Sequence, residues 1–199
     1  MSSLIQIENA DRDLLASIAA SMVEATRRSG SWLACRLGCT QCCIGPFAIT
    51  QLDVLRLRSG LATLEASDPA RAAAVRARAA AYVEKIAPVY PGDPGTGELF
   101  GEQDLPDSTD ELPCPALDPA TGACDLYDAR PITCRSFGPA TKIGDGRLAA
   151  CELCYVGATD AEIAACAVEL DPEGLELTLV EALEKAGRKG VTIVGYALV

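Results

Sequence analysis

Residues 35–43 read Cys35-Arg-Leu-Gly-Cys39-Thr-Gln-Cys42-Cys43 and place four cysteines within nine positions. Thiols this close along a chain can converge on one centre at a small cost in chain entropy. Gly38 permits the tight turn that such convergence needs. In a reducing compartment, clustered cysteines are typical of metal or redox sites. We therefore interpret this segment as part of a metal site.

The remaining composition limits the kinds of catalytic site and metal site that the chain can contain. The chain has 199 residues, with ten cysteines and no histidine. Without an imidazole it cannot contain a Ser-His-Asp or Cys-His nucleophile, a His-bearing zinc finger or a Rieske centre. Any metal must sit on sulfur, oxygen, water or a bound ligand.

The charge balance bears on partners and location. With 28 acidic and 17 basic side chains, the formal net charge is −11. That balance argues against nucleic acid and against anionic membrane surfaces as partners.

The first residues, MSSLIQIENADRD, lack the features of a signal peptide, and no long apolar stretch predicts a transmembrane helix. We predict a cytoplasmic protein without nucleic-acid or membrane partners, and the sequence does not indicate its oligomeric state.

Helical patterns flank the cysteine-rich loops. Apolar spacing, capping residues and propensity predict helices over residues 11–28, 69–87, 160–170 and 175–186, and a short helix opened by Thr50 and closed by Gly60. Asp145-Gly146 predicts a hairpin turn, and residues 191–199 predict a short terminal strand. We expect a mainly α fold: one small helical domain over residues 1–199, wrapped around irregular cysteine-rich loops, with at most a short β-hairpin.

Residues 88–113 interrupt the helical pattern as an acidic insertion. They are rich in proline and glycine and contain no basic residue. Their seven acidic residues are Asp93, Glu98, Glu102, Asp104, Asp107, Asp110 and Glu111. Such a segment predicts an irregular, mobile connection, with a functional lid as the alternative.

A second set of cysteines follows the insertion. Cys166 lies inside a predicted helix, and we assign it to the core. The C-x₂-C spacing of Cys151 and Cys154, shared by Cys39 and Cys42, is typical of zinc sites. Cys114-Pro115 is instead typical of an iron–sulfur ligand, so both metals stay open. The candidate ligands of this set are Cys114, Cys124, Cys134, Cys151 and Cys154.

Cys42 and Cys43 are informative because they are adjacent. Neighbouring side chains point in different directions on an extended segment or a helix. We therefore expect them to serve two centres, or one of them to pack rather than bind. With the other cysteines, this predicts one four-sulfur site and leaves room for a second.

The cysteine strings resemble a known family. Besides the double cysteine, the chain carries Cys114-Pro115 and then Gly122-x-Cys124-x-Leu126-Tyr127-x-x-Arg130-Pro131-x-x-Cys134-Arg135-x-Phe137. Over about residues 30–140 this resembles the YkgJ-type cysteine-cluster family, which is described as chelating zinc or iron and includes the flagellin lysine N-methylases. The first gap holds three residues here, where the family pattern has two. The resemblance implies metal on Cys35, Cys39, Cys42, Cys43, Cys114, Cys124 and Cys134.

Cys151 and Cys154 lie beyond that resemblance, and their spacing makes them candidates for a second quartet. Four thiolates on Zn²⁺ or on a [4Fe-4S]²⁺ cluster leave an excess negative charge. Arg130 and Arg135 are placed to neutralise it or to donate to sulfur, and we predict that they bind the cofactor. Alternatively, both arginines form surface ion pairs with Asp125 and Asp128. We assign Tyr127 and Phe137 to the core.

Three functions follow from these features. The favoured one is an iron–sulfur centre, with 4Fe-4S preferred because the ligands are exclusively sulfur and exceed one zinc site. The resemblance implies that it supports a modification such as S-adenosylmethionine-dependent methylation of a protein substrate. The second is a zinc-stabilised binding module without catalytic activity. The third, metal storage or delivery, fits the substantial predicted core less well.

Overall fold

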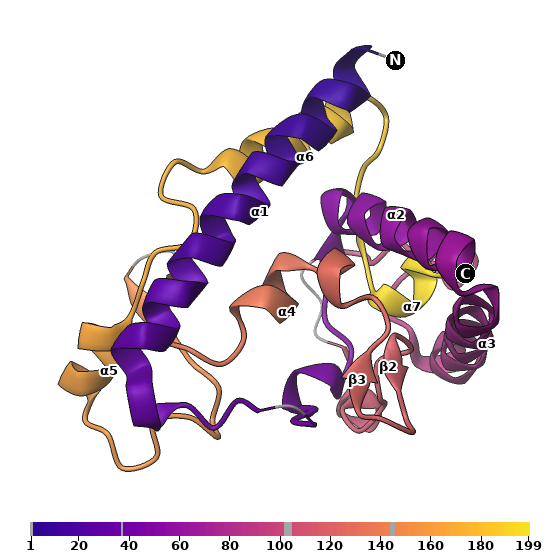
Figure 1. Ribbon diagram of the computed structural model, residues 1–199. Coiled ribbons are helices and arrows are strands. Elements are labelled where there is room, and N and C mark those ends of the chain that lie inside the picture. Colours follow the sequence, from indigo (N-terminus) through magenta and orange to yellow (C-terminus); the bar gives the residue numbers. More distant parts are fainter. Residues whose placement is uncertain (1, 37, 102–104, 144–145) are drawn as a thin grey trace. The chain divides into compact units, whose positions relative to one another are not determined.

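The computed structural model describes residues 2–36, 38–101, 105–143 and 146–199 (Figure 1). The chain divides into two compact units, each of which is described by itself. Unit 1 consists of Met1–Arg36 and Ile132–Ala182, and unit 2 consists of Leu37–Pro131 and Leu183–Val199. The predicted mainly α fold is confirmed, with α-helices and 3₁₀ turns as its main elements. A single domain over the whole chain stays a prediction.

Unit 1 is organised around one long helix, α1 (Ser2–Ser29), drawn in indigo in Figure 1. It begins earlier than the predicted residue 11, because Ile7 extends the buried stripe formed by Leu14 and Ile18. The short helices α4 (Ile132–Ser136) and α5 (Asp160–Cys166) pack against it. Gly30, at φ +51°, follows its end as predicted.

Beyond α4, unit 1 contains a β-hairpin, helix α5 and a β-bridge. Strands β4 (Thr141–Ile143) and β5 (Arg147–Ala149) pair antiparallel around the predicted turn, of which Asp145 lies outside the described residues. The predicted capping box of Thr159 and Glu162 opens α5. This helix ends at Cys166 rather than at residue 170, because Val168 forms a parallel β-bridge with Thr141, the first residue of β4. Helix α6 (Leu175–Lys185) follows as predicted.

Unit 2 is built on two consecutive helices, α2 (Gln51–Ser67) and α3 (Pro69–Ile86), which pack against each other. Thr50 opens α2 with the predicted capping box, and Asp68 caps α3. The prediction that Gly60 ends the first helix is wrong, since α2 runs through it. Gly60 instead lets Ala129 approach the helix, because a Cβ at Gly60 would lie 2.2 Å from the Cβ of Ala129.

The C-terminal residues close the core of unit 2. Strand β6 (Val191–Thr192) pairs antiparallel with β1 (Ile49–Thr50). Beyond Thr192 the predicted strand is wrong, because α7 (Val194–Ala197) forms there and buries its apolar residues against α2 and α3. Tertiary burial outweighs β-propensity at this position. Arg58 reinforces the arrangement by donating from Nε to the carbonyl of Ala197 at 3.2 Å.

The acidic insertion is irregular, as predicted, apart from 3₁₀ turns at Ala87–Val89 and Asp107–Thr109. It is nevertheless tied to unit 2. The hydroxyl of Tyr90 donates to the carbonyl of Gly97 at 2.6 Å, and the N–H of Leu99 donates to the carbonyl of Val191 at 3.0 Å. Leu99 is buried in the same cluster as Tyr90. Glu102 and Asp104 lie outside the described residues.

The third strand pair, β2 (Leu117–Asp118) and β3 (Ala123–Cys124), is also antiparallel. The described strands therefore form three two-stranded sheets, where the sequence indicated at most one hairpin. Within the described ranges, the chain has no helix with the length and apolar character needed to span a membrane.

Candidate metal centre

The candidate ligands are divided between the two units. All ten cysteines lie among the described residues, and no disulfide joins any of them. The assignment of residues to units therefore separates the sulfurs into two sets of five. Unit 2 holds Cys39, Cys42, Cys43, Cys114 and Cys124, whereas unit 1 holds Cys35, Cys134, Cys151, Cys154 and Cys166.

In unit 2, the double cysteine lies in a short 3₁₀ turn, Gln41–Cys43, closed by the N–H of Cys43 on the carbonyl of Thr40 at 2.8 Å. The carbonyl of Cys43 in turn accepts from the N–H of Cys114 at 2.7 Å. The next residue, Ile44, forms a β-bridge with Pro113. This backbone pairing brings the first cysteine motif against the second.

The β2–β3 hairpin adds Cys124 to the same place. Cys124 stands opposite Leu117 in the strand register, and the N–H of Leu117 donates to the carbonyl of Cys114 at 2.9 Å. Cys114 and Cys124 are partly buried and pack against the main core cluster of unit 2. Cysteines from three separate segments therefore converge.

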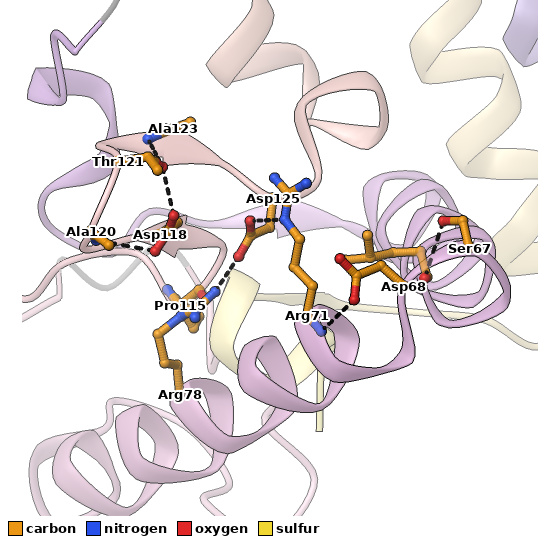
Figure 2. Close-up of polar contacts among 11 residues, drawn as sticks. Ser67, Asp68, Arg71, Arg78, Pro115, Asp118, Ala120, Thr121, Ala123 and Asp125 are labelled. Atoms are coloured by element: carbon orange, nitrogen blue, oxygen red, sulfur yellow. Dashed lines mark hydrogen bonds and ion pairs between the residues drawn. The ribbon is translucent and has the colours of Figure 1, made fainter.

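Two arginines of α3 hold the loops that carry Cys114 and Cys124, as Figure 2 shows. Arg78 donates from Nη2 to Oδ2 of Asp125 at 2.5 Å and from Nε to the carbonyl of Pro115 at 2.9 Å. Arg71 donates from Nε to Oδ1 of the same carboxylate at 2.5 Å. Pro115 and Asp125 each directly follow a candidate ligand. We call Arg71, Arg78 and Asp125 the α3 clamp.

The sequence interpretation missed this clamp. Arg71 and Arg78 are seven residues apart and therefore share one face of a helix, which is the signal that could have indicated it. Asp118 supports the hairpin turn beside the clamp, because its carboxylate accepts from the hydroxyl of Thr121 at 2.6 Å and from the N–H of Ala120 at 3.1 Å (Figure 2).

The two thiols of the double cysteine, Cys42 and Cys43, interact electrostatically through a hydrogen bond between their side chains. That the two serve different centres, or that one of them packs, stays a prediction. The hydrogen bond lowers the pKa of Cys42 to about 6, and the Arg130 guanidinium contributes to the same shift. The pKa of Cys43 is correspondingly raised well above its usual range, by the same bond and by burial. Cys42 is therefore the thiolate of the pair at neutral pH.

The two deeper cysteines have the opposite character. Burial raises the pKa of Cys114 to about 12 and also raises the pKa of Cys124. The charge of Arg130 opposes the rise at Cys124. Cys114 and Cys124 also raise the pKa of Cys43 through their charges, so the four sulfurs influence one another. The arrangement favours a cation that would replace their protons.

The charge of Arg130 lowers the pKa of Cys42 and opposes the rise in the pKa of Cys124, and its role in binding a cofactor stays a prediction. Its Nε donates to the carbonyl of Tyr127 at 2.8 Å, and its guanidinium carbon lies 3.5 Å from the centre of the Tyr127 ring. Asp125 pairs with Arg71 and Arg78 in the α3 clamp. The alternative, in which Arg130 and Arg135 form ion pairs with Asp125 and Asp128, stays a prediction. The assignment of Tyr127 and Phe137 to the core is wrong, because 59% of Tyr127 and 43% of Phe137 are exposed.

The predicted ligands of unit 1 occupy three segments. Cys134 and Arg135 are neighbours on α4, Cys35 is exposed, and Cys151 and Cys154 are buried in one apolar cluster. The structure therefore places Arg130 and Arg135 in different units. Cys166 is buried as predicted, and its thiol donates to the carbonyl of Arg28 at 3.4 Å.

The donor chemistry fits a thiophilic metal, because every candidate ligand is a cysteine and the chain contains no histidine. Among the residues that the structure describes, no three cysteine or acidic side chains are already arranged to hold a metal ion. The fit of this chain to a metal therefore rests on the chemistry of its donors.

Residues 34–155 match the model of the CxxCxxCC family, whose description is "putative zinc- or iron-chelating domain". The match covers more than half of the chain. The chain belongs to this family. The match includes nine of the ten cysteines, Cys166 being the exception, and agrees with the predicted resemblance. No curated protein and no solved structure gave a significant match.

Proposed function

We propose that unit 2 holds an iron–sulfur cluster, with 4Fe-4S favoured, on ligands drawn from its five cysteines. The observation that carries the proposal is the backbone pairing of the two cysteine motifs, with Cys114 donating to the carbonyl of Cys43 at 2.7 Å. Membership of a zinc- or iron-chelating family supports a metal there. All candidate ligands are sulfur, and there are more of them than one zinc site uses. Both facts favour iron.

The residues around these cysteines would have distinct tasks. The α3 clamp would hold the backbone beside Cys114 and Cys124 so that their sulfurs keep a fixed spacing. Arg130 would offset the excess negative charge of the thiolates, as its effect on the pKa of Cys42 and Cys124 indicates. A bound cluster would supply electron transfer or an open iron for a ligand.

The number of cysteines in unit 2 extends the proposal to catalysis. Four of the five would complete a cluster, which leaves one as an exchangeable ligand. By family resemblance, we propose S-adenosylmethionine as a co-substrate and a protein as the methyl acceptor. Ten cysteines without a disulfide suit a reducing compartment, so the cytoplasm is our proposed location.

The competing proposal is a zinc-stabilised binding module without catalytic activity. The C-x₂-C spacing of Cys39 and Cys42 supports it, because such pairs are typical of structural zinc. In that case metal binding would contribute directly to folding, and no coordination position would stay open for a ligand.

The experiment compares Cys114→Ser with the matched control Cys166→Ser, both purified without oxygen. We expect the first variant to lose visible absorption, bound iron and S-adenosylmethionine binding in equilibrium dialysis, while the control keeps all three. Equal iron and absorption in both variants would contradict the cluster in unit 2. Intact absorption without S-adenosylmethionine binding in the wild type would contradict the proposed methylation alone.

A further inference from the structure

We propose that Cys151 and Cys154 are a redox-active pair of thiols, which forms a disulfide within one turn of unit 1 by exchange with a small-molecule disulfide. In this exchange the two thiols together give up two protons and two electrons, and one S–S bond forms between them. The S–S bond of the small molecule breaks and yields two thiols. In a reducing compartment such a disulfide is transient and responds to oxidation. The exchange involves no metal and no cysteine of unit 2.

The backbone already brings the two cysteines close together. The N–H of Cys154 donates to the carbonyl of Cys151 at 2.9 Å. A hydrogen bond between residues three apart closes a β-turn, whose outer Cα atoms lie within about 7 Å of each other. A disulfide spans Cα atoms that are about 4.4–6.8 Å apart. A disulfide between Cys151 and Cys154 therefore requires little movement of the backbone.

The turn directs both cysteine side chains to its inner side. Cys151 and Cys154 are buried, at 5% and 6% exposure, in one apolar cluster. Glu152 and Leu153, which lie between them, are exposed. The N–H of Ala34 also donates to Sγ of Cys154 at 3.5 Å, which orients that sulfur. The two thiols therefore lie on the same side of the turn, beneath a short exposed segment.

Tyr155 connects this turn to the end of helix α1. It directly follows Cys154 and is the one non-glycine residue of the described chain with positive φ, at +57°. Its N–H donates to the carbonyl of Trp32 at 2.9 Å, and its hydroxyl lies 2.5 Å from Oγ of Ser29, the last residue of α1. Backbone held in so sparsely populated a conformation is characteristic of functional sites. A disulfide that changes the turn therefore changes the surroundings of Trp32.

Cys166 is a matched cysteine that lacks such a partner. It is buried in the same cluster, but it lies on α5 and its thiol donates to the carbonyl of Arg28 at 3.4 Å. No other cysteine stands three residues from it in the sequence. Core packing alone accounts for Cys166, which makes it the internal control for the pair.

The first test maps the disulfide in the wild-type chain, purified without oxygen and equilibrated with mixtures of glutathione and glutathione disulfide. Free thiols are alkylated, and trypsin then releases residues 148–185, which contain Cys151, Cys154 and Cys166. We expect the oxidised peptide to lack two hydrogens and to carry one alkyl group, on Cys166, and we expect glutathione to reverse this. Three alkyl groups in every mixture, or a disulfide of either cysteine with any other partner, would overturn the proposal.

The second test follows the fluorescence of Trp32, the single tryptophan of the chain, in the same mixtures. We expect one reversible change in the wild type, with the midpoint found for the disulfide by mapping. C151S should lose this change, and C166S should keep it. The same change in C151S would contradict the proposal. Mapping of the wild-type chain decides the question if C151S does not fold.

Two controls separate this site from metal binding. Mapping of the wild-type chain after treatment with a chelator should give the same midpoint, and a disulfide that forms only after chelation would overturn the proposal, because metal would then hold the pair. C114S, which should lose the iron proposed for unit 2, should still form the disulfide. A C114S chain that does not form it would also overturn the proposal, whereas a wild-type chain without iron contradicts the proposed function alone.

Discussion

One guanidinium, that of Arg78, contacts both loops that carry the deeper cysteines of unit 2: it donates to Oδ2 of Asp125 at 2.5 Å and to the carbonyl of Pro115 at 2.9 Å. The Asp125 side chain is only 2% exposed, so it depends on its arginine partners. The spacing of Cys114 and Cys124 is therefore coupled to helix α3.

Replacing Arg78 with alanine should destabilise the protein by about 1–3 kcal/mol, because a buried carboxylate loses one partner and a carbonyl loses its donor. Urea denaturation of the metal-free protein measures this change in the free energy of unfolding. Arg76→Ala on the same helix is the matched control, since its partner Glu65 is exposed and such surface pairs contribute little.

Arg78→Lys separates charge from geometry. A lysine keeps the positive charge but cannot present the planar fork that contacts Asp125 and Pro115 together. We expect it to recover only part of the lost stability. Equal free energies of unfolding for Arg78→Ala and Arg76→Ala would contradict the role assigned to the clamp.

Gly60→Ala should destabilise unit 2 by about 1–3 kcal/mol through overpacking against Ala129, although alanine normally favours a helix interior by about 1 kcal/mol. The double variant Gly60→Ala/Ala129→Gly should recover most of that loss, because it removes the opposing Cβ. Thermal unfolding of the three chains measures the effect. A stabilised single variant would show that the two segments do not approach each other this closely.

Tyr155→Phe should destabilise the protein by about 1–3 kcal/mol, since it leaves the buried N–H of Ala140 without its acceptor and removes the contact with Ser29. Tyr127→Phe is the matched control, because Tyr127 is largely exposed and should change the free energy of unfolding little. Urea denaturation measures the stability of both variants. Equal, small losses of stability in the two would contradict the role given to the Tyr155 hydroxyl.

Cys42 should be the most reactive thiol of unit 2 in metal-free protein. Its pKa is lowered to about 6, chiefly by the hydrogen bond from Cys43, so it is ionised at neutral pH. Alkylation rates followed by mass spectrometry should fall as the pH drops through about 6. Cys43→Ala should move the midpoint upward, and an unchanged midpoint would rule out the thiol pair as the cause.

Metal affinity should rise with pH. Burial raises the pKa of Cys114 to about 12, so its thiol carries a proton at pH 7 that a metal must displace. Each displaced proton weakens apparent binding about tenfold for each unit that the pH falls. Competition titrations with a chelator between pH 6 and pH 8 measure this slope, and affinity independent of pH would contradict thiolate ligation at Cys114.

Local sequence signals predicted much of the fold. The capping boxes at Thr50 and Thr159 and the stop at Gly30 depend on residues close together in the chain, and each is found where predicted. Gly60 misled the prediction because its reason lies in a contact with Ala129, which a local pattern does not contain. The prediction of a terminal strand is wrong beyond Thr192 for the same reason, since Val194 packs into a core made by distant helices.

The sequence predicted which residues are candidate metal ligands, but not how these residues are divided between the two units. Cysteine spacing indicated metal ligands, and the family match agrees with that. Spacing did not show that Cys35 falls in a different unit from Cys39, four residues away. Nor did it show Asp125 as an anchor, because its partners Arg71 and Arg78 lie on a helix before the acidic insertion.

The central claim is that this chain holds metal on cysteine sulfur, with iron in unit 2. The most direct measurement is the iron, zinc and acid-labile sulfide content of the wild-type chain, purified without oxygen, together with its visible absorption spectrum. The account predicts a brown protein with bound iron and sulfide. A colourless chain that carries zinc alone would contradict the iron–sulfur proposal, and a chain that retains no metal would contradict the account as a whole.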